Sequence, residues 1–205
     1  MDPKTKFILS TGLGIAWACA TVFGARELLK YESAAGDIGK VTAHWPASSS
    51  IQPAADRPTL VMFAHPQCPC TRASVAELGS IVAHTQNKVR VFVLFYTPQN
   101  SAAGWMNTPL RRDIEQIAGV TIIPDPEGVE AQRFGAETSG HAFLFDRDGH
   151  LLFNGGITSS RGHAGENVGE DSIVSLINER SASQRATLVF GCSFHNRKES
   201  GACLK

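Results

Sequence analysis

Apolar residues gather in short uninterrupted runs, and these runs predict the strands of a buried sheet. Residues 59–65 (TLVMFAH) and 89–98 (VRVFVLFYTP) are apolar at successive positions, which is typical of strands covered on both faces. Residues 120–125 (VTIIPD) predict a shorter strand. Residues 141–157 (HAFLFDRDGHLLFNGGI) predict a hairpin, because the Asp-Gly dipeptide between its apolar runs is a common hairpin turn.

Between and after these strands, apolar residues recur at the three- and four-residue spacing of helices. The stripes are Val75, Leu78, Ile81 and Val82 in the first helix, Leu110, Ile114 and Ile117 in the second, and Ile173, Leu176 and Ile177 in the last. Thr108 and Pro109 provide an N-cap and a first-turn proline for the second helix. Asp125 and Pro126 repeat this device before a short helix that ends at Gly135. Alternating strands and helices predict an α/β fold with a central mixed sheet.

An uncharged segment precedes the part of the chain that is predicted to fold. Residues 7–25 (FILSTGLGIAWACATVFGA) contain no charged side chain. A helix needs about 20 apolar residues to cross a bilayer. We therefore predict one N-terminal transmembrane helix and assign residues 1–32 to a membrane anchor. The alternative is a cleaved signal peptide, since Ala18-Cys19-Ala20 has the small-x-small form of a cleavage site.

The remaining sequence divides by composition. Residues 33–56 are rich in Ser, Ala and Pro with little periodicity, and they predict a linker. The strand and helix pattern occupies residues 57–190, which we assign to one domain. Residues 191–205 form a C-terminal tail that contains two cysteines.

The charge balance narrows the range of partners. The chain has 19 basic and 19 acidic residues, so no basic excess indicates a nucleic acid partner. The glycine-rich residues 155–169 lack the glycine spacing of a phosphate-binding loop between a strand and a helix. We expect neither nucleic acid nor a nucleotide to bind.

The candidate chemistry lies in a Cys-Pro-Cys motif where the first strand turns into its helix, a position where α/β sheets often place ligands. Cys68 and Cys70 flank Pro69, which restricts the backbone between them. A helix N-terminus lowers the pKa of a nearby cysteine, and the thiolate is the reactive form. A Cys68–Cys70 disulfide would close a very small ring and would be easily reduced. We predict a redox-active pair rather than a structural crosslink.

Three motifs resemble those of thioredoxin-fold proteins, in particular the membrane-anchored branch called RedB-like. They are HPQCPCTRAS (65–74), TSGHAFLFDRDGHLLFNGGITSSRGHAGEN (138–167) and VFGC (189–192). The resemblance covers residues 57–193. It implies a thioredoxin-like three-layer fold with a central mixed sheet, preceded by one transmembrane helix.

The sequence departs from ordinary thioredoxins in two places. The usual motif has two residues between its cysteines, whereas this one has only Pro69, so Cys70 takes the second cysteine's place and Gln67 the first. Where thioredoxins have a cis-proline, the resemblance places Gly140, followed by His141. It further implies that His141 faces the cysteine pair across the active-site groove and takes part in catalysis.

Two hypotheses follow from the motif. In the first, the protein is a thiol-disulfide oxidoreductase without a cofactor, in which Cys68 attacks and Cys70 resolves the mixed disulfide. Its substrate is an envelope protein thiol, and its role lies in the assembly of an envelope protein complex. The resemblance and the anchor place the folded domain on the periplasmic side of a bacterial-type inner membrane.

In the second hypothesis, the protein is a copper or zinc carrier, or an assembly factor. Cys68 and Cys70 would bind the metal with imidazoles from His65, His141 and His163, since thiolates and imidazoles suit copper(I) and zinc. Each histidine also has an ordinary structural explanation. A non-catalytic accessory subunit of a membrane complex is a further alternative.

The other cysteines bear on the compartment. Cys19 lies in the apolar segment, and the four that remain are an even number, which fits an oxidising environment. The simplest pairing is Cys68–Cys70 with Cys192–Cys203. Alternatively, Cys192 approaches the active site and acts as a second-stage thiol.

Overall fold

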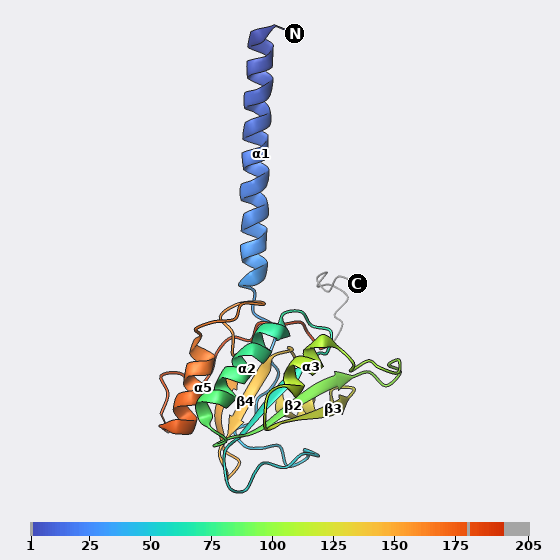
Figure 1. Ribbon diagram of the computed structural model, residues 1–205, viewed down its shortest axis with the longest axis vertical. Coiled ribbons are helices and arrows are strands. Elements are labelled where there is room, and N and C mark those ends of the chain that lie inside the picture. The colour runs from blue at the N-terminus through green and yellow to red at the C-terminus, as the bar shows by residue number, and fades with distance from the viewer. Residues whose placement is uncertain (1, 180, 195–205) are drawn as a thin grey trace. The chain divides into compact units, whose positions relative to one another are not determined.

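In the computed structural model, which describes residues 2–179 and 181–194, the chain divides into two compact units, with the boundary after Ala34. The first unit is helix α1 (Pro3–Glu32), which has no buried side chain (Figure 1). The helix is long and apolar enough to cross a membrane, as the sequence predicted. A signal sequence near the N-terminus meets the same criterion of length and apolar composition, so this finding fits both interpretations of the segment.

The second unit is built on a five-stranded sheet in the order β3-β2-β1-β4-β5 (Figure 1). The strands are β1 (Thr59–Ala64), β2 (Arg90–Thr97), β3 (Val120–Pro126), β4 (His141–Phe145) and β5 (Leu151–Gly155). β1, β2 and β3 run parallel, whereas β4 runs antiparallel to both β1 and β5. The predicted central mixed sheet is confirmed.

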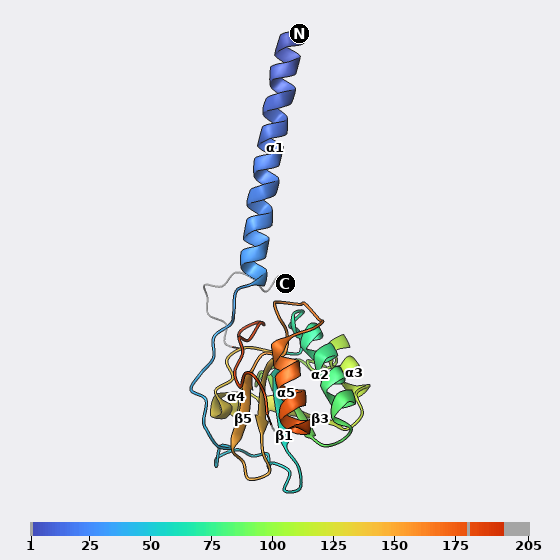
Figure 2. The ribbon, with the colours of Figure 1, turned by 90° about the vertical axis from the view of Figure 1, so that its left-hand side faces the viewer.

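Helices cover both faces of this sheet and make three layers (Figure 2). α2 (Thr71–Thr85), α3 (Pro109–Glu115) and α5 (Val168–Asn178) pack on one face through an aliphatic cluster. The short α4 (Val129–Phe134) packs on the other face through an aromatic cluster. The α/β fold class predicted from the alternation of elements is therefore correct.

Strand β1 shows how the sequence builds both clusters at once. All six of its residues are buried, and alternate side chains point to opposite faces. Leu60 and Met62 join the aliphatic cluster, whereas Phe63 joins the aromatic one. The ring of Phe63 lies 5.3 Å from that of Phe134 and 5.9 Å from that of Phe143, in tilted and edge-on arrangements that aromatic pairs prefer. Burial of each such side chain stabilises the fold by about 1.5–3 kcal/mol.

The helix starts are capped much as the sequence predicts. The Thr108 hydroxyl accepts a hydrogen bond from the Arg111 N–H at 3.3 Å, which caps α3. The Asp125 carboxylate accepts the N–H groups of Glu130 and Ala131, both at 2.9 Å, at the start of α4. One detail of the prediction is wrong: Pro126 ends β3 instead of opening α4.

The predicted linker, residues 33–56, is folded over most of its length, so this prediction needs correction. Residues from Ala35 onward belong to the same compact unit as the sheet. The Trp45 ring packs 5.1 Å from Phe134, and the Ser49 hydroxyl donates a hydrogen bond of 2.7 Å to the Glu130 carboxylate. Isolated anchors of this kind produce no periodic pattern, so the segment looked like a tether.

The predicted tail also contributes to the fold in the part that the structure describes, residues 191–194. The Ser139 N–H donates to the Cys192 carbonyl at 2.8 Å, and the Phe194 N–H donates to the Glu137 carbonyl at 3.0 Å. The domain therefore extends beyond the predicted boundary at residue 190. Cys203, and with it the predicted Cys192–Cys203 disulfide, lies outside the described residues.

Candidate functional site

The loop from β1 to α2 positions two cysteines through consecutive tight turns. The Cys68 N–H donates to the His65 carbonyl at 3.0 Å, and the Thr71 N–H donates to the Cys68 carbonyl at 3.3 Å. Cys70 immediately precedes the first residue of α2, where backbone N–H groups and the helix dipole favour negative charge. Pro69 links the two turns, and its carbonyl accepts the Arg72 N–H at 3.3 Å.

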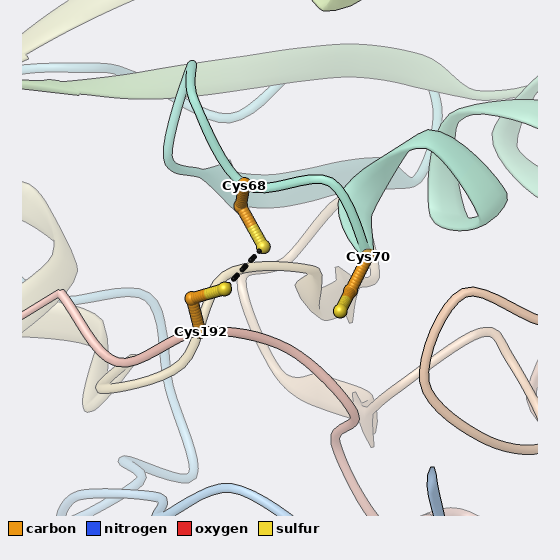
Figure 3. A group of neighbouring side chains, drawn as sticks. All are labelled: Cys68, Cys70 and Cys192. Carbon is orange, nitrogen blue, oxygen red and sulfur yellow. Dashed lines mark hydrogen bonds between the residues drawn. The ribbon is translucent and has the colours of Figure 1, made fainter. Parts of the chain in front are cut away.

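A third cysteine reaches the same place from the end of the chain. Figure 3 shows the side chains of Cys68, Cys70 and Cys192 converging from two separate segments. The Sγ atoms of Cys68 and Cys192 share a hydrogen bond and lie 2.9 Å apart. All three sulfurs lie within 4.8 Å of one another. The residues are 2, 8 and 9% exposed, respectively, so the cluster is largely shielded from water.

This cluster favours the thiolate form of Cys68. Hydrogen bonds from Cys192 and then from Cys70 hold the pKa of the Cys68 thiol far below its ordinary value. Burial opposes the shift, and the Thr71 hydroxyl and the Cys192 backbone N–H reinforce it. Cys68 is therefore the activated sulfur of the three cysteines in this cluster.

Cys70 behaves in the opposite way. Its hydrogen bond with Cys192 lowers the pKa of the Cys70 thiol, but the hydrogen bond to Cys68, burial and the negative charge of Cys68 together raise it above the ordinary value. The guanidinium of Arg161 lowers this pKa by Coulomb attraction. Two adjacent sulfurs thus differ in charge, as expected when like charges compete for one site.

Arg161 also connects the glycine-rich loop to the C-terminal segment. Its Nη1 donates a hydrogen bond to the Gly191 carbonyl, next to Cys192. The cation therefore lies beside the thiol cluster and helps to hold the backbone that carries the third cysteine.

Comparisons with known proteins concern the fold. No family model matches the chain, and no curated protein matches its sequence. An uncharacterized conserved protein from Geobacillus kaustophilus has 17% identity and a TM-score of 0.56, with 79% of this chain and 92% of that chain covered. A hypothetical protein from Sinorhizobium meliloti has 18% identity and a TM-score of 0.52, with coverages of 80% and 96%.

A putative thiol:disulfide interchange protein DsbE from Chlorobium tepidum has 16% identity and a TM-score of 0.44, with 72% of this chain and 96% of that chain covered. The β1-α2-β2 and β4-β5-α5 units share one mixed sheet, with the cysteine motif at the start of α2. This topology, with the motif at the start of its first long helix, gives the chain a thioredoxin-like fold. Because one fold hosts many functions, the topology alone assigns no activity.

The loop opposite the cysteines in this thioredoxin-like fold ends at Gly140. Gly140 has φ +91°, and its N–H donates to the Phe63 carbonyl at 2.7 Å. A Cβ at this position would lie 2.9 Å from Ser74 Oγ on α2, so the loop lies close against the helix that follows the motif.

His141 does not take the predicted position facing the cysteines. It is fully buried on the β4 face that carries Phe143, and the two rings are 4.1 Å apart. The α2 helix packs on the other face. Among the described residues, neither ring nitrogen has a hydrogen-bond partner, and burial lowers the pKa of His141 to about 3. His141 is a packing residue, because strand alternation directs its side chain toward the aromatic cluster.

The other two histidines that were predicted as metal ligands, His65 and His163, do not join the group of sulfur atoms either. His65 stacks on Tyr96 at 5.7 Å, and its Nδ1 accepts the Gln67 N–H at 3.2 Å. Burial lowers the pKa of His65, and the charge of Cys68 opposes this. His163 is exposed in the glycine-rich loop, where its N–H donates to the Ser160 carbonyl at 3.4 Å. In the described part of the chain, the ligand group at this site consists of sulfur atoms alone.

Sequence reasoning found the two motif cysteines but missed Thr71 and Arg161, which act on their pKa values. It also missed Ser139, whose hydroxyl forms hydrogen bonds with the His65 N–H, at 2.8 Å, and the Thr71 hydroxyl, at 2.6 Å. Cys192 was considered only as an alternative. Its signal was the VFGC motif, which no local pattern links to the first strand.

Cys68 and Cys70 are free cysteines in this structure, so their predicted disulfide remains a prediction about the oxidised protein.

Proposed function

We propose that this protein is a membrane-anchored thiol-disulfide oxidoreductase that acts outside the cytoplasm through its Cys-Pro-Cys motif. The observation that carries the proposal is the cluster of three sulfurs before α2, in which Cys68 Sγ lies 2.9 Å from Cys192 Sγ. The thiols of Cys192 and Cys70 lower the pKa of Cys68. A thiolate at a helix N-terminus is the nucleophile that thiol exchange requires.

In this proposal, the Cys68 thiolate attacks one sulfur of a substrate disulfide. A bond forms between Cys68 and that sulfur, and the second substrate sulfur leaves as a thiolate. A second thiol of the protein then attacks Cys68 and releases the substrate. No cofactor is required, because the sulfurs carry both electrons.

The setting of the reaction is also part of the proposal. Helix α1 would anchor the chain in a bacterial-type inner membrane, with the domain on the periplasmic side. Disulfide chemistry persists in such oxidising compartments. The substrate would be a thiol or disulfide of an envelope protein, within the assembly of an envelope complex.

The test uses the full-length protein in detergent micelles. The reduced protein is mixed with glutathione disulfide without air, and the remaining thiols and the released glutathione are counted. Wild type should form one intramolecular disulfide per chain and release two glutathione molecules. Cys68→Ser should lose this reaction, whereas the control Cys19→Ser, in α1, should match wild type. Wild-type rates of oxidation in Cys68→Ser would disprove the proposal.

A second candidate function is a copper(I) or zinc carrier. The observation that favours it is the group of three sulfurs from Cys68, Cys70 and Cys192, all within 4.8 Å of one another. Soft thiolates select copper(I) and also bind zinc. The ligand set would therefore consist of thiolates, without His65, His141 and His163.

Copper(I) titration against a chromophoric chelator separates this candidate from the first. A carrier should bind one copper(I) tightly, lose affinity in Cys192→Ser, and keep it in His141→Leu. A reduced wild-type protein that leaves all copper(I) with the chelator is not a copper carrier.

A further inference from the structure

We infer that Cys192, rather than Cys70, forms the disulfide with Cys68. We also infer that the C-terminal segment, residues 189–194, pairs with the domain as an extended substrate chain would and so holds Cys192 against the reactive sulfur. This inference rests on the proposed function and names the partner sulfur of that site. It replaces the predicted Cys68–Cys70 disulfide with a crosslink between two distant parts of the chain.

The first support is the distance between the sulfurs. Cys68 Sγ and Cys192 Sγ lie 2.9 Å apart, and a disulfide bond needs about 2.05 Å, so a movement of less than about 1 Å brings them to bonding distance. Cys70 is confined to the same turn as Cys68 by Pro69, and a disulfide between them would close a very small ring. The Cys68–Cys192 pair spans 124 positions, and crosslinks over long loops remove more chain entropy from the unfolded state.

The second support is the way in which the backbone presents Cys192. Thr138 and Ser193 form an antiparallel bridge. On either side of it, the Ser139 N–H donates to the Cys192 carbonyl at 2.8 Å and the Phe194 N–H donates to the Glu137 carbonyl at 3.0 Å. The segment is therefore paired like an added strand, a common way to bind an extended peptide. This pairing fixes the position of Cys192 along the loop that faces Cys68.

The third support is the tight packing on both sides of Cys192. A Cβ at Gly191 would lie 1.9 Å from the Ser139 carbonyl oxygen, so only glycine fits there without displacement. Phe194 stacks on Tyr96 at 6.0 Å and is 5% exposed. The segment is thus anchored at both ends of the short stretch that carries the thiol.

Chemically, the inference concerns the second step of exchange. After Cys68 is joined to a substrate sulfur, the Cys192 thiolate attacks Cys68 Sγ. The Cys68–Cys192 bond forms, the bond between Cys68 and the substrate breaks, and the substrate sulfur leaves as a thiolate that takes up a proton. Two electrons pass from the Cys68 and Cys192 thiols to the substrate disulfide, which is reduced to two thiols. An external dithiol is needed to return the protein to its reduced state.

The same segment limits access to the nucleophile. Cys68 is only 2% exposed, and its sulfur lies 2.9 Å from that of Cys192, so we expect a substrate disulfide to displace the segment that carries Cys192. Attack by Cys192 restores the backbone pairing and expels the product. Cys70 remains a thiol throughout, and its role is to donate the hydrogen bond that lowers the pKa of Cys68.

The test is disulfide mapping in the full-length protein with Cys203→Ser, a change that excludes Cys203 as a competing partner. The reduced protein is oxidised with glutathione disulfide, its free thiols are alkylated, and its peptides are identified by mass spectrometry. The expected result is a Cys68–Cys192 crosslink with Cys70 alkylated. A Cys68–Cys70 crosslink with Cys192 alkylated would overturn the inference alone. Absence of any oxidation would overturn both the inference and the proposed function.

Two variants in the same background provide a kinetic test. With one equivalent of glutathione disulfide, Cys192→Ser should accumulate a stable glutathione adduct on Cys68, whereas Cys70→Ser should proceed to the intramolecular disulfide. The reverse pattern would overturn the inference.

Gly191→Ala tests the segment without removing a sulfur. It should slow closure of the Cys68–Cys192 bond at least tenfold and raise the rate of Cys68 alkylation by an external reagent. Gly79→Ala is the matched control, since a Cβ there makes ordinary contacts of 3.8 Å with Ile117. Equal rates in both glycine variants would overturn the assigned role of the segment.

Discussion

Cys68 and Cys192 are 124 positions apart in the sequence, and their sulfur atoms lie 2.9 Å apart. One lies between β1 and α2, and the other lies in the segment that pairs with residues 137–139. The candidate active site therefore exists only when the whole domain has folded. Its reactivity depends on contacts that no short stretch of the chain contains.

Arg161 is expected to control the charge of the second motif cysteine. Its guanidinium lowers the pKa of Cys70, so Arg161→Gln should raise that pKa further. Alkylation of Cys70 at pH 8, measured by mass spectrometry, should slow by about threefold to tenfold, since one pKa unit changes the thiolate fraction about tenfold.

Arg161→Lys retains the positive charge, so the alkylation rate of Cys70 should fall much less in this variant than in Arg161→Gln. Arg72→Gln is the matched control, because Arg72 is an exposed cation on the first turn of α2. If all three variants alkylate at the wild-type rate, Arg161 does not act on the thiols.

Glu77 joins α2 to the loop that carries Arg161. Its carboxylate accepts the Gly165 N–H at 2.7 Å and the Asn167 side-chain amide at 3.2 Å. Burial, and then a hydrogen bond with Glu170, raise the pKa of Glu77 to about 7. The folded protein therefore holds this proton more tightly than the unfolded chain does.

It follows that Glu77 makes stability fall as pH rises. Its contribution is complete below the ordinary pKa of 4.5 and is lost as pH rises through the folded pKa of about 7. Between these pH values, the free energy of unfolding of wild type, measured with urea, should fall by up to about 1.4 kcal/mol per pH unit relative to that of Glu77→Gln. Glu166→Gln, exposed on the same loop, serves as the control. A constant difference between wild type and Glu77→Gln over this range would contradict the assignment.

His141 has the opposite dependence on pH. Burial lowers its pKa from 6.5 to about 3, so its stabilising contribution is present above pH 6.5 and is lost as pH falls toward 3. His141→Leu removes two buried nitrogens without partners in the described chain. As pH falls, the free energy of unfolding of this variant should rise relative to that of wild type by up to about 1.4 kcal/mol per pH unit. Its Cys68 alkylation rate should equal that of wild type, because His141 lies with Phe143 away from α2. Slower alkylation of Cys68 in His141→Leu than in wild type would show that His141 belongs to the site.

The membrane anchor has its own test. Helix α1 exposes an uncharged, largely apolar surface over residues 7–25, so the full chain should stay with membranes after extraction at high pH. Protease added to spheroplasts should then degrade the domain. Recovery of all protein in the soluble fraction, with its N-terminus at Thr21, would show that the segment is a cleaved signal peptide.

Local patterns predicted the framework well. The hairpin followed from its Asp-Gly turn, where Gly149 adopts φ +82°, and α3 followed from Thr108 and Pro109. Turns and helix caps depend on residues that are close together in the sequence, so a single sequence is enough to predict them. The Cys-Pro-Cys motif belongs to the same class of signal, because its position between a strand and a helix is local.

The rest of the site depends on long-range packing. Nothing near Cys192 or Arg161 in the sequence indicates that a thiol and a guanidinium meet at the start of α2. His141 was placed on the wrong side, because alternation along β4 groups it with Phe143 but does not tell which face α2 covers. The segment before β1 was taken for a tether because Trp45 and Ile51 anchor it singly.

The central claim is that Cys68 is a stabilised thiolate within a cluster of three cysteines. The most direct test is the alkylation rate of Cys68 against pH in the reduced full-length protein, followed by mass spectrometry. The account predicts a rate that has already reached its plateau in the acidic range, because the pKa of Cys68 is far below 9.0, and a rise of that pKa in Cys192→Ser. A rate that keeps increasing up to pH 9, equally in wild type and Cys192→Ser, would contradict the account.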